Sequence, residues 1–217
     1  MSREYDLVVF DWDGTLMDSA AKIVSCMQSA ARDEGVCPPE QKEIEEVIGL
    51  GLPQALEQLF PGESAAVRSG LQKQYSVHYA ENDKTHTPFF PGVEECLVEL
   101  ESLGYLLAVA TGKSRKGLNR VFKSTSVGKF FISSRCADET ASKPDPLMLN
   151  ELMSELDCVP ERVLMVGDTE YDMEMARNAG VTPVAVSYGV HEIERLHAYQ
   201  PRYCVDEISQ LISHLKV

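Results

Sequence analysis

The sequence lacks the features of a membrane protein, a disulfide scaffold or a zinc knot. Its six cysteines are scattered with no Cys-x-x-Cys pair, which predicts free, buried thiols in a reducing compartment. No apolar run approaches the roughly 20 residues that a membrane span needs. The polar N-terminus passes directly into an apolar strand, so we expect no signal peptide. These absences favour a cytoplasmic globular protein.

Positive charge is also scarce. The 20 basic residues are outnumbered by 34 acidic ones, which gives a formal net charge of −14. We therefore expect no binding of nucleic acid or anionic membrane through charge, and any phosphate site needs a local positive group, such as a metal ion, a lysine or backbone amides. A chain of 217 residues that is 44% hydrophobic suits one α/β domain, or a core with a small insert, in a monomer or homodimer.

The most informative stretch lies near the start of the chain. Residues 7–10 form an apolar run that predicts a buried strand, and Asp11 and Asp13 follow it. Because side chains alternate along an extended segment, the two carboxylates project to one side and Trp12 to the other, toward the core. Carboxylates at this end of a strand suit Mg²⁺, and Gly14 permits a tight turn there. An ordinary Asp-Gly turn is the alternative, but two unpartnered charges would be costly at the end of a buried strand.

The next part of the chain is helical throughout. Apolar spacing predicts four helices, over residues 20–34, 40–48, 53–60 and 63–81, with Asp18 or Ser19 as the cap of the first. A polar junction that ends at Pro88 is typical of a linker. The sequence therefore predicts a core formed by residues 1–16 and 88–217, with a separate helical lobe at 17–87.

From residue 91 onward, strands and helices alternate. The expected strands are 105–110, 130–133, 163–166, 181–186 and an edge strand at 203–205. The expected helices are 93–103, a helix capped by Ser114 that runs to about 123, one that ends near 156, one that ends at 179, and 206–215. This order favours a mostly parallel sheet with helices on both faces.

Polar residues follow the strong strands at the point where each ends. Because these ends lie along one edge of a parallel sheet, we expect their side chains to converge. Each alone has an ordinary explanation, such as a turn, a cap or a solvated lysine, but together they predict a site. The residues are Asp11 and Asp13, Thr111 and Gly112, Asp168 and Asp172, and Lys143 from a further loop.

This pattern resembles the haloacid dehalogenase (HAD) superfamily. Its four motifs appear in order as Asp11-x-Asp13, Thr111, Lys143-Pro144, and Gly167-Asp168 with Asp172. The third match is the least specific, since Lys113 is a competing lysine. The helical lobe is similar to the α-helical cap of the phosphoglycolate-phosphatase-like branch. The resemblance implies an α/β fold, with a Rossmann-like, mostly parallel core and an inserted helical cap.

The resemblance also implies roles for the first-motif residues. A carboxylate nucleophile splits phosphate ester hydrolysis into two steps through an aspartyl-phosphate, and Asp11 is the candidate. Asp13 would protonate the leaving oxygen and later deprotonate water. The expected cofactor is Mg²⁺, bound by Asp11, Asp168 and the backbone carbonyl of Asp13, while Asp172 would bind it through water or hold Lys143.

The other motif residues would contact the phosphoryl group. The Thr111 hydroxyl and the Gly112 N–H can donate to its oxygens, and Lys143 would neutralise charge in the transition state. The segment 49–52 resembles the cap's substrate-specificity loop, although a plain helix connection is the alternative. It contains no arginine, which weakens the case for a highly charged second anion. Arg115 and Lys116 either reach a substrate carboxylate or form a solvated helix face.

The favoured function is a Mg²⁺-dependent phosphatase that acts on a small phosphate monoester resembling phosphoglycolate. Three alternatives remain open. A phosphomutase would return the phosphoryl group to a bound sugar phosphate, and a non-catalytic protein would only bind a phosphorylated ligand. A haloacid dehalogenase would need neither Asp13 nor Asp168, so their presence speaks against it. The five histidines show no ligand spacing and receive no role.

Overall fold

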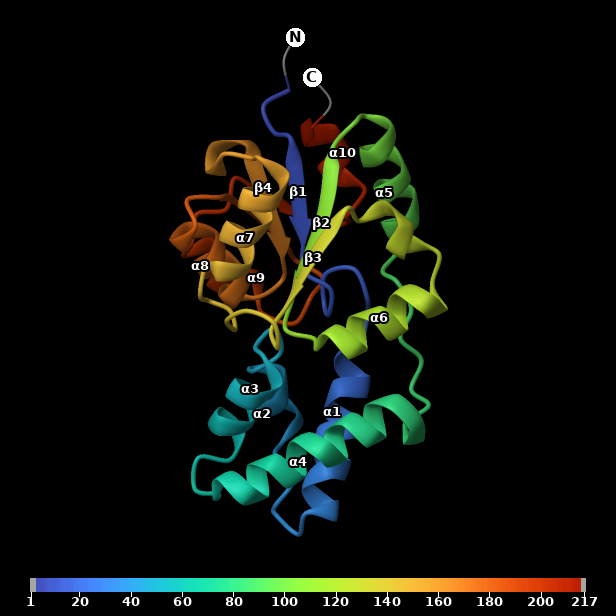
Figure 1. The fold of residues 1–217 in the computed structure, drawn as a ribbon, viewed down its shortest axis with the longest axis vertical. Helices are drawn as coiled ribbons and strands as arrows, with labels where there is room; N and C mark the ends of the chain where they lie inside the picture. The colour runs from blue at the N-terminus through green and yellow to red at the C-terminus, as the bar shows by residue number, and fades with distance from the viewer. Residues whose placement is uncertain (1–2, 216–217) are drawn as a thin grey trace.

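A parallel sheet forms the upper lobe of the protein (Figure 1), in a computed structural model that describes residues 3–215. Within these residues the sheet has six strands in the order β3-β2-β1-β4-β5-β6, and every neighbouring pair is parallel. The predicted α/β fold is therefore confirmed. The strands are β1 (Leu7–Phe10), β2 (Leu106–Thr111), β3 (Ser133–Cys136), β4 (Val163–Gly167), β5 (Thr182–Val186) and β6 (Tyr203–Val205).

Helices cover both faces of this sheet, as Figure 1 shows. On one face lie α5 (Val93–Ser102), α6 (Arg115–Ser124) and α10 (Gln210–Leu215), and on the other α7 (Leu147–Leu156) and α8 (Glu170–Asn178). Alternate residues of β1 face the two layers: Val8 and Phe10 pack with the first, Leu7 and Val9 with the second. A strand buried on both faces is necessarily a continuous apolar run, which explains the sequence pattern.

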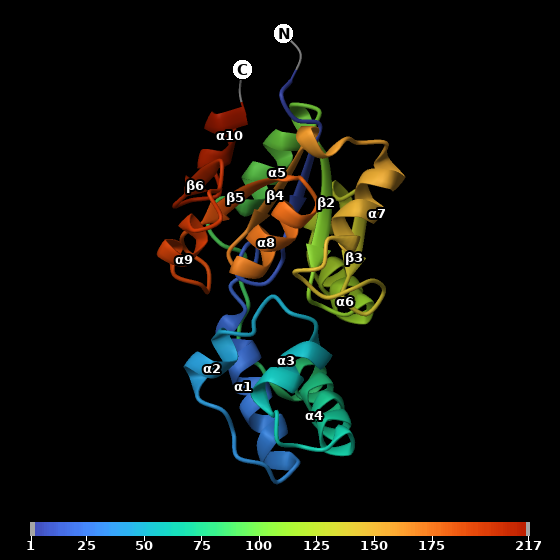
Figure 2. The same ribbon diagram turned by 90° about the vertical axis from the view of Figure 1, so that its left-hand side faces the viewer.

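A helical lobe lies below the sheet (Figure 2). It contains α1 (Ala20–Asp33), α2 (Gln41–Glu45), α3 (Leu52–Leu59), α4 (Ala65–Val77) and a π-helical turn, η1 (His78–Asn82). The helices enclose their own apolar cluster, which includes Met27, Ile44, Leu56 and Leu71. Hereafter we call this lobe the cap.

The two chain segments that join the lobes lie side by side. Met17 forms a bridge with Phe89, and the Asp18 N–H donates to the Pro88 carbonyl at 2.9 Å. The division of the chain at residues 17 and 87 stays a prediction.

Two local expectations are wrong. The strand expected at 130–133 lies at Ser133–Cys136, because Phe130 and Phe131 pack against the core instead, at the end of the 3-10 helix η2 (Val127–Phe130). Ser19 stands at the N-cap of α1, but its hydroxyl donates to the Asp13 carboxylate and does not cap the helix. Two short elements escaped prediction, the 3-10 helix η3 (Pro160–Arg162) and α9 (Ile193–His197).

The cysteine prediction holds in part. All six thiols are free, but Cys37 and Cys204 are exposed and Cys158 is half-buried. Within residues 3–215, none of the helices combines the length and hydrophobicity that a membrane crossing requires.

Candidate active site

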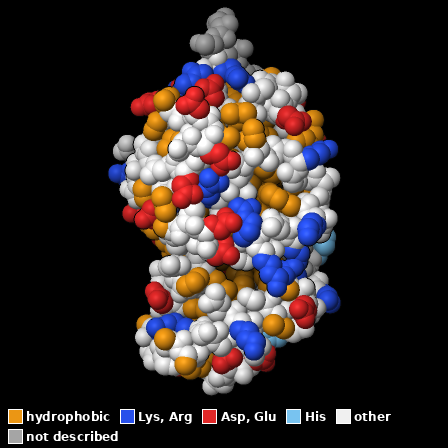
Figure 3. All heavy atoms as spheres, viewed as in Figure 1, with side chains coloured by type: hydrophobic (Ala, Val, Ile, Leu, Met, Phe, Trp, Pro, Cys, Tyr) orange, Lys and Arg blue, Asp and Glu red, His pale blue; other side chains and the backbone are white. Residues whose placement is uncertain are grey.

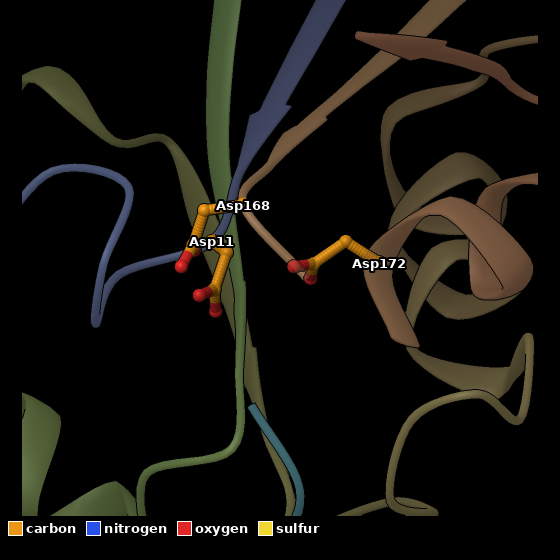
Figure 4. Close-up of side chains that lie close together, drawn as sticks. All are labelled: Asp11, Asp168 and Asp172. Carbon is orange, nitrogen blue, oxygen red and sulfur yellow. The ribbon is translucent and has the colours of Figure 1, made fainter. Parts of the chain in front are cut away.

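Three buried carboxylates meet at the carboxyl edge of the sheet (Figure 4). Asp11 follows β1 and Asp168 follows β4, and these strands are hydrogen-bonded neighbours with Phe10 paired to Val166. Asp172 comes from the first turn of α8 and points across toward the other two. One oxygen from each carboxylate lies within 4.8 Å of the others. The predicted convergence of strand ends is therefore found.

Lys143 joins two of these carboxylates. Its Nζ lies 2.5 Å from Asp11 Oδ1 and 2.6 Å from Asp172 Oδ1, with its side chain fully buried. Burial alone would favour the neutral amine, but Asp11 and Asp172 outweigh it and raise the pKa of Lys143, which is therefore charged. Lys143, and not Lys113, is the lysine beside Asp11.

Burial also governs the acidic groups. It raises the pKa of Asp11 well above its usual range, against the pull of Lys143, and the charges of Asp172 and Asp168 add to this rise. The pKa of Asp168 is raised to about 7, first by burial and then by Asp172. One ammonium thus faces three carboxylates, and the cluster resists full ionisation unless further positive charge arrives.

The cluster fits a divalent cation. The buried Asp11 Oδ2 has no hydrogen-bond partner among residues 3–215, although an orphaned buried carboxylate oxygen is costly. All the donor atoms are oxygens, the ligands preferred by hard ions such as Mg²⁺. Asp11, Asp168 and Asp172 are therefore the side chains that could hold a metal ion.

Local contacts fix Asp168 in place. It accepts hydrogen bonds from the Thr15 hydroxyl at 2.7 Å and from the Val190 N–H at 2.9 Å. Gly14 has φ +90°, and a Cβ there would lie 2.1 Å from Asp168 Oδ2. The first-motif glycine is therefore needed both for its backbone conformation and for the room it leaves the carboxylate.

Asp172 is held by its own helix. Thr169 and Asp172 form a reciprocal capping box, in which Asp172 Oδ2 accepts from the Thr169 hydroxyl at 2.7 Å and from its N–H at 3.1 Å. The other oxygen remains for Lys143. Asp172 Oδ2 is thus used in the capping box of α8, and Oδ1 is the oxygen that binds Lys143.

Asp13 lies outside this cluster. Its Oδ1 accepts from the Ser19 hydroxyl at 2.5 Å and pairs with Lys113 Nζ at 2.8 Å. Thr111, fully buried at the end of β2, accepts the Lys113 N–H at 3.2 Å. Asp13 therefore faces a second cation, separate from the one that Asp11 contacts.

A cavity of about 450 Å³ lies between the core and the cap. Asp11, Asp13 and Lys113 line its core side, while the cap supplies mainly apolar side chains, among them Ile23, Met27, Ile44, Val47, Leu52 and Tyr75. Figure 3 shows a waist between the lobes with hydrophobic atoms inside it and basic side chains gathered beside it. Asp11 is thus the member of the carboxylate cluster that faces the cavity under the cap.

The loop at 49–51 lies directly on the core. A Cβ added to Gly112 would be 2.4 Å from the Leu50 carbonyl oxygen, and the Gly51 N–H donates to Ser142 Oγ at 2.8 Å. The loop also lines the cavity. Its role as a substrate-specificity loop stays a prediction.

A second set of contacts ties the cap to the core near α8. Arg195 of α9 binds both carboxylate oxygens of Glu46 at 2.8 and 2.9 Å and also binds Glu170 at 2.6 Å. The Tyr171 hydroxyl donates to the Glu46 carbonyl at 2.8 Å. Because Glu46 belongs to the cap, these bonds hold the lobes together in the present arrangement.

Sequence reasoning missed one cap residue beside the site. Tyr79 lies within the helix expected at 63–81, and its hydroxyl accepts a hydrogen bond from Lys113 Nζ at 3.1 Å. No sequence signal marks this contact, because it joins residues of the two lobes. Arg115 is occupied by Ser134 and Glu139, which favours a structural role over contact with substrate.

Comparisons with known proteins agree with the geometry. A family model described as haloacid dehalogenase-like hydrolase matches residues 8–186. The "Probable phosphatase IndB" of Dickeya dadantii is 35% identical over 95% of this chain and 91% of its own length. A phosphoglycolate phosphatase of Vibrio vulnificus is 29% identical over 97% of this chain and 96% of its own.

The solved structures agree as to the fold. A crystal structure described as a predicted phosphoglycolate phosphatase of Haemophilus somnus superposes with a TM-score of 0.88 at 23% identity, covering 98% of this chain and 99% of that one. The chain belongs to the haloacid dehalogenase-like hydrolase family. Within that family it is a phosphoric monoester hydrolase, as the sequence predicts.

Proposed function

We propose that this protein hydrolyses a small phosphate monoester with Mg²⁺, through an aspartyl-phosphate on Asp11, and that phosphoglycolate is the first substrate to test. The proposal rests on one observation above all. Lys143 bridges Asp11 and Asp172 in a buried cluster, and one Asp11 oxygen still has no partner in the part of the chain that the structure describes. The substrate follows from the name of the Vibrio vulnificus relative.

The reaction has two steps. In the first, an Asp11 carboxylate oxygen attacks phosphorus, the bond from phosphorus to the leaving oxygen breaks, and Asp13 gives that oxygen a proton. In the second, Asp13 takes a proton from a water molecule whose oxygen attacks phosphorus, and the bond to Asp11 breaks. The products are inorganic phosphate and an alcohol, and both aspartates return to their starting state.

Positive charge makes these steps possible. Asp11, Asp168 and the backbone carbonyl of Asp13 would hold Mg²⁺, with Asp172 acting through water or through Lys143. Bound Mg²⁺ offsets the repulsion between the phosphoryl group and the carboxylates. Lys143 adds a fixed charge beside the nucleophile, while the Thr111 hydroxyl and the Gly112 N–H donate to phosphoryl oxygens.

The cap would exclude water and select the leaving group. We assign residues 1–16 and 88–217 to the catalytic core and 17–87 to the cap, whose loop at 49–51 lies against Gly112. The cavity beneath it would enclose the substrate while the phosphoryl group is transferred. We further propose a cytoplasmic location and a monomeric or homodimeric state, with no nucleic acid or membrane partner.

The test is release of inorganic phosphate from phosphate monoesters, with Mg²⁺ and with a chelator. Asp11→Asn keeps the side-chain size and removes the nucleophile. Asp206→Asn is the matched control, because this carboxylate is exposed, accepts a hydrogen bond from Ser187 and lies outside the cavity. We expect Mg²⁺-dependent turnover in the wild type and the control and none in Asp11→Asn. Turnover that survives in Asp11→Asn, or that needs no divalent ion, would contradict the proposal.

Product analysis addresses the other functions. A phosphomutase would convert a sugar phosphate to its isomer without releasing phosphate in proportion. A dehalogenase would release halide from a haloacid and leave every ester intact. A binding protein would bind phosphorylated ligands without turnover, and aluminium fluoride would fail to form an adduct on Asp11.

A further inference from the structure

Lys113 lines the cavity but has no part in the proposed chemistry. It follows Thr111 and Gly112 at the end of β2, and its side chain is only 8% exposed. Its Nζ pairs with Asp13 at 2.8 Å and donates to the hydroxyl of Tyr79, a cap residue, at 3.1 Å. Both lobes therefore contribute to fixing this ammonium group beside the candidate acid.

Counting donors leaves one hydrogen bond unmade. A lysine ammonium carries three N–H groups, and within residues 3–215 Lys113 Nζ bonds to Asp13 and Tyr79 alone. Lys113 and Tyr79 both line the cavity, together with Asp11 and Asp13. The remaining donor is therefore available to a molecule bound there. A buried cation with a spare donor is suited to a carboxylate or another anionic oxygen.

The position of Lys113 relative to the reacting groups is informative. Asp13 must lie next to the leaving oxygen if it is to protonate it. Lys113 contacts Asp13 and therefore lies near the atoms attached to that oxygen. Lys143 contacts Asp11, the candidate nucleophile, instead. The two buried lysines thus serve different parts of the substrate, one the phosphoryl group and the other the leaving group.

We propose that Lys113, oriented by Tyr79 of the cap, binds an anionic oxygen carried by the leaving group close to the ester oxygen. This inference rests on the proposed phosphatase function and specifies its substrate class, a phosphate monoester of a hydroxy acid. An ester without the second anion leaves the third donor of Lys113 unpaired in a buried site, which disfavours its binding.

The rim of the cavity supports an anionic substrate. Lys73 of α4 and Lys116 and Arg120 of α6 line it, and all three are exposed without an ion-pair partner among the described residues. Basic side chains collect at the same place in Figure 3, beside the waist. The exposed carboxylates of Glu81 and Asp138 line the cavity too, so the three cations leave its rim slightly positive in a chain of net charge −14.

The experiment compares two substrates with leaving groups of two carbons, phosphoglycolate and ethyl phosphate. The measured quantity is the ratio of their kcat/KM values, because intrinsic reactivity cancels when one ratio is compared between variants. The variants are Lys113→Met, Lys113→Arg and Tyr79→Phe. Lys123→Met is the matched control, since it removes an exposed lysine outside the cavity from α6, the helix that follows Lys113.

We expect Lys113→Met to lower the ratio about 10- to 100-fold, the usual effect of losing a charged hydrogen bond. Lys113→Arg should keep most of the ratio, Tyr79→Phe should lower it about 2- to 10-fold, and Lys123→Met should leave it unchanged. In an Asp11→Asn background, calorimetry should show that Lys113→Met weakens phosphoglycolate binding by a similar factor. This binding measurement does not depend on turnover.

The outcomes separate the two proposals. If ethyl phosphate and phosphoglycolate are hydrolysed equally well, or if Lys113→Met leaves the ratio unchanged, the role of Lys113 is refuted while the phosphatase function stands. If no ester is hydrolysed under any condition, the phosphatase function itself fails. Should Lys113→Met fail to fold, the ratio in Lys113→Arg and Tyr79→Phe decides, and a wild-type ratio in Tyr79→Phe would overturn the part assigned to the cap.

Discussion

The carboxylate cluster makes the metal-free protein sensitive to pH in a direction that can be calculated. The pKa of Asp168 is raised from 3.8 to about 7 in the folded chain. Between these values the folded protein keeps a proton on Asp168 that the unfolded chain has lost. The folded state therefore binds more protons, and its stability falls as pH rises through this window and then levels off above about pH 7.

The expected magnitude follows from the same two values. At about 1.36 kcal/mol per pH unit, the change from 3.8 to about 7 corresponds to a loss of about 4 kcal/mol. Asp168→Asn removes the titration. The hydrogen bonds from Thr15 and Val190 favour the ionised carboxylate, and their effect is already contained in the pKa of Asp168, so it disappears from the variant together with the titration.

The assay is urea unfolding in the presence of a chelator at pH 4, 6 and 8, followed by the fluorescence of Trp12. This is the single tryptophan of the chain and is fully buried, so its emission reports unfolding. We expect the stability of Asp168→Asn relative to wild type to rise by about 4 kcal/mol from pH 4 to pH 8. In saturating Mg²⁺ at pH 8, Asp168→Asn should be less stable than the wild type, because the variant lacks a metal ligand. If the difference in unfolding free energy between Asp168→Asn and the wild type does not change with pH, the reasoning is refuted. The control Asp206→Asn should follow the wild type at every pH.

Three further predictions concern the cap. Gly112→Ala places a methyl group against the Leu50 carbonyl, an overpacking that costs about 1–3 kcal/mol in the closed arrangement. We expect it to lower kcat/KM about 5- to 100-fold with little change in Tm. Gly62→Ala is the control and should have no effect, because open space surrounds that position. Arg195→Gln should raise KM about two- to fivefold at low salt, and wild type and variant should converge at 1 M salt. Leu71→Ala should cost about 2–5 kcal/mol by emptying the cap core, as measured by urea unfolding, and a wild-type midpoint would show that this core contributes little.

The strand ends were readable from the sequence because the motif residues follow apolar runs directly. Leu7–Phe10 is buried on both faces, so its composition alone marks a central strand, and Asp11 must then lie at the sheet edge. The same reasoning failed at β3, an edge strand with the polar sequence Ser-Ser-Arg-Cys. An edge strand makes fewer contacts with the core, so its sequence carries less of the apolar pattern that identifies central strands.

The sequence by itself determined the order of the elements, the helical insertion and the set of polar residues that meet at the sheet edge. Tertiary structure alone decided how those residues pair. Lys113 competes with Lys143 in the sequence, but in the structure Lys143 pairs with Asp11 across 132 positions and Lys113 pairs with Asp13 and with Tyr79 of the cap. The reason is physical: periodicity and burial act on neighbouring residues and set local structure. The partner of a buried charge depends on the packing of distant elements, which no local pattern records.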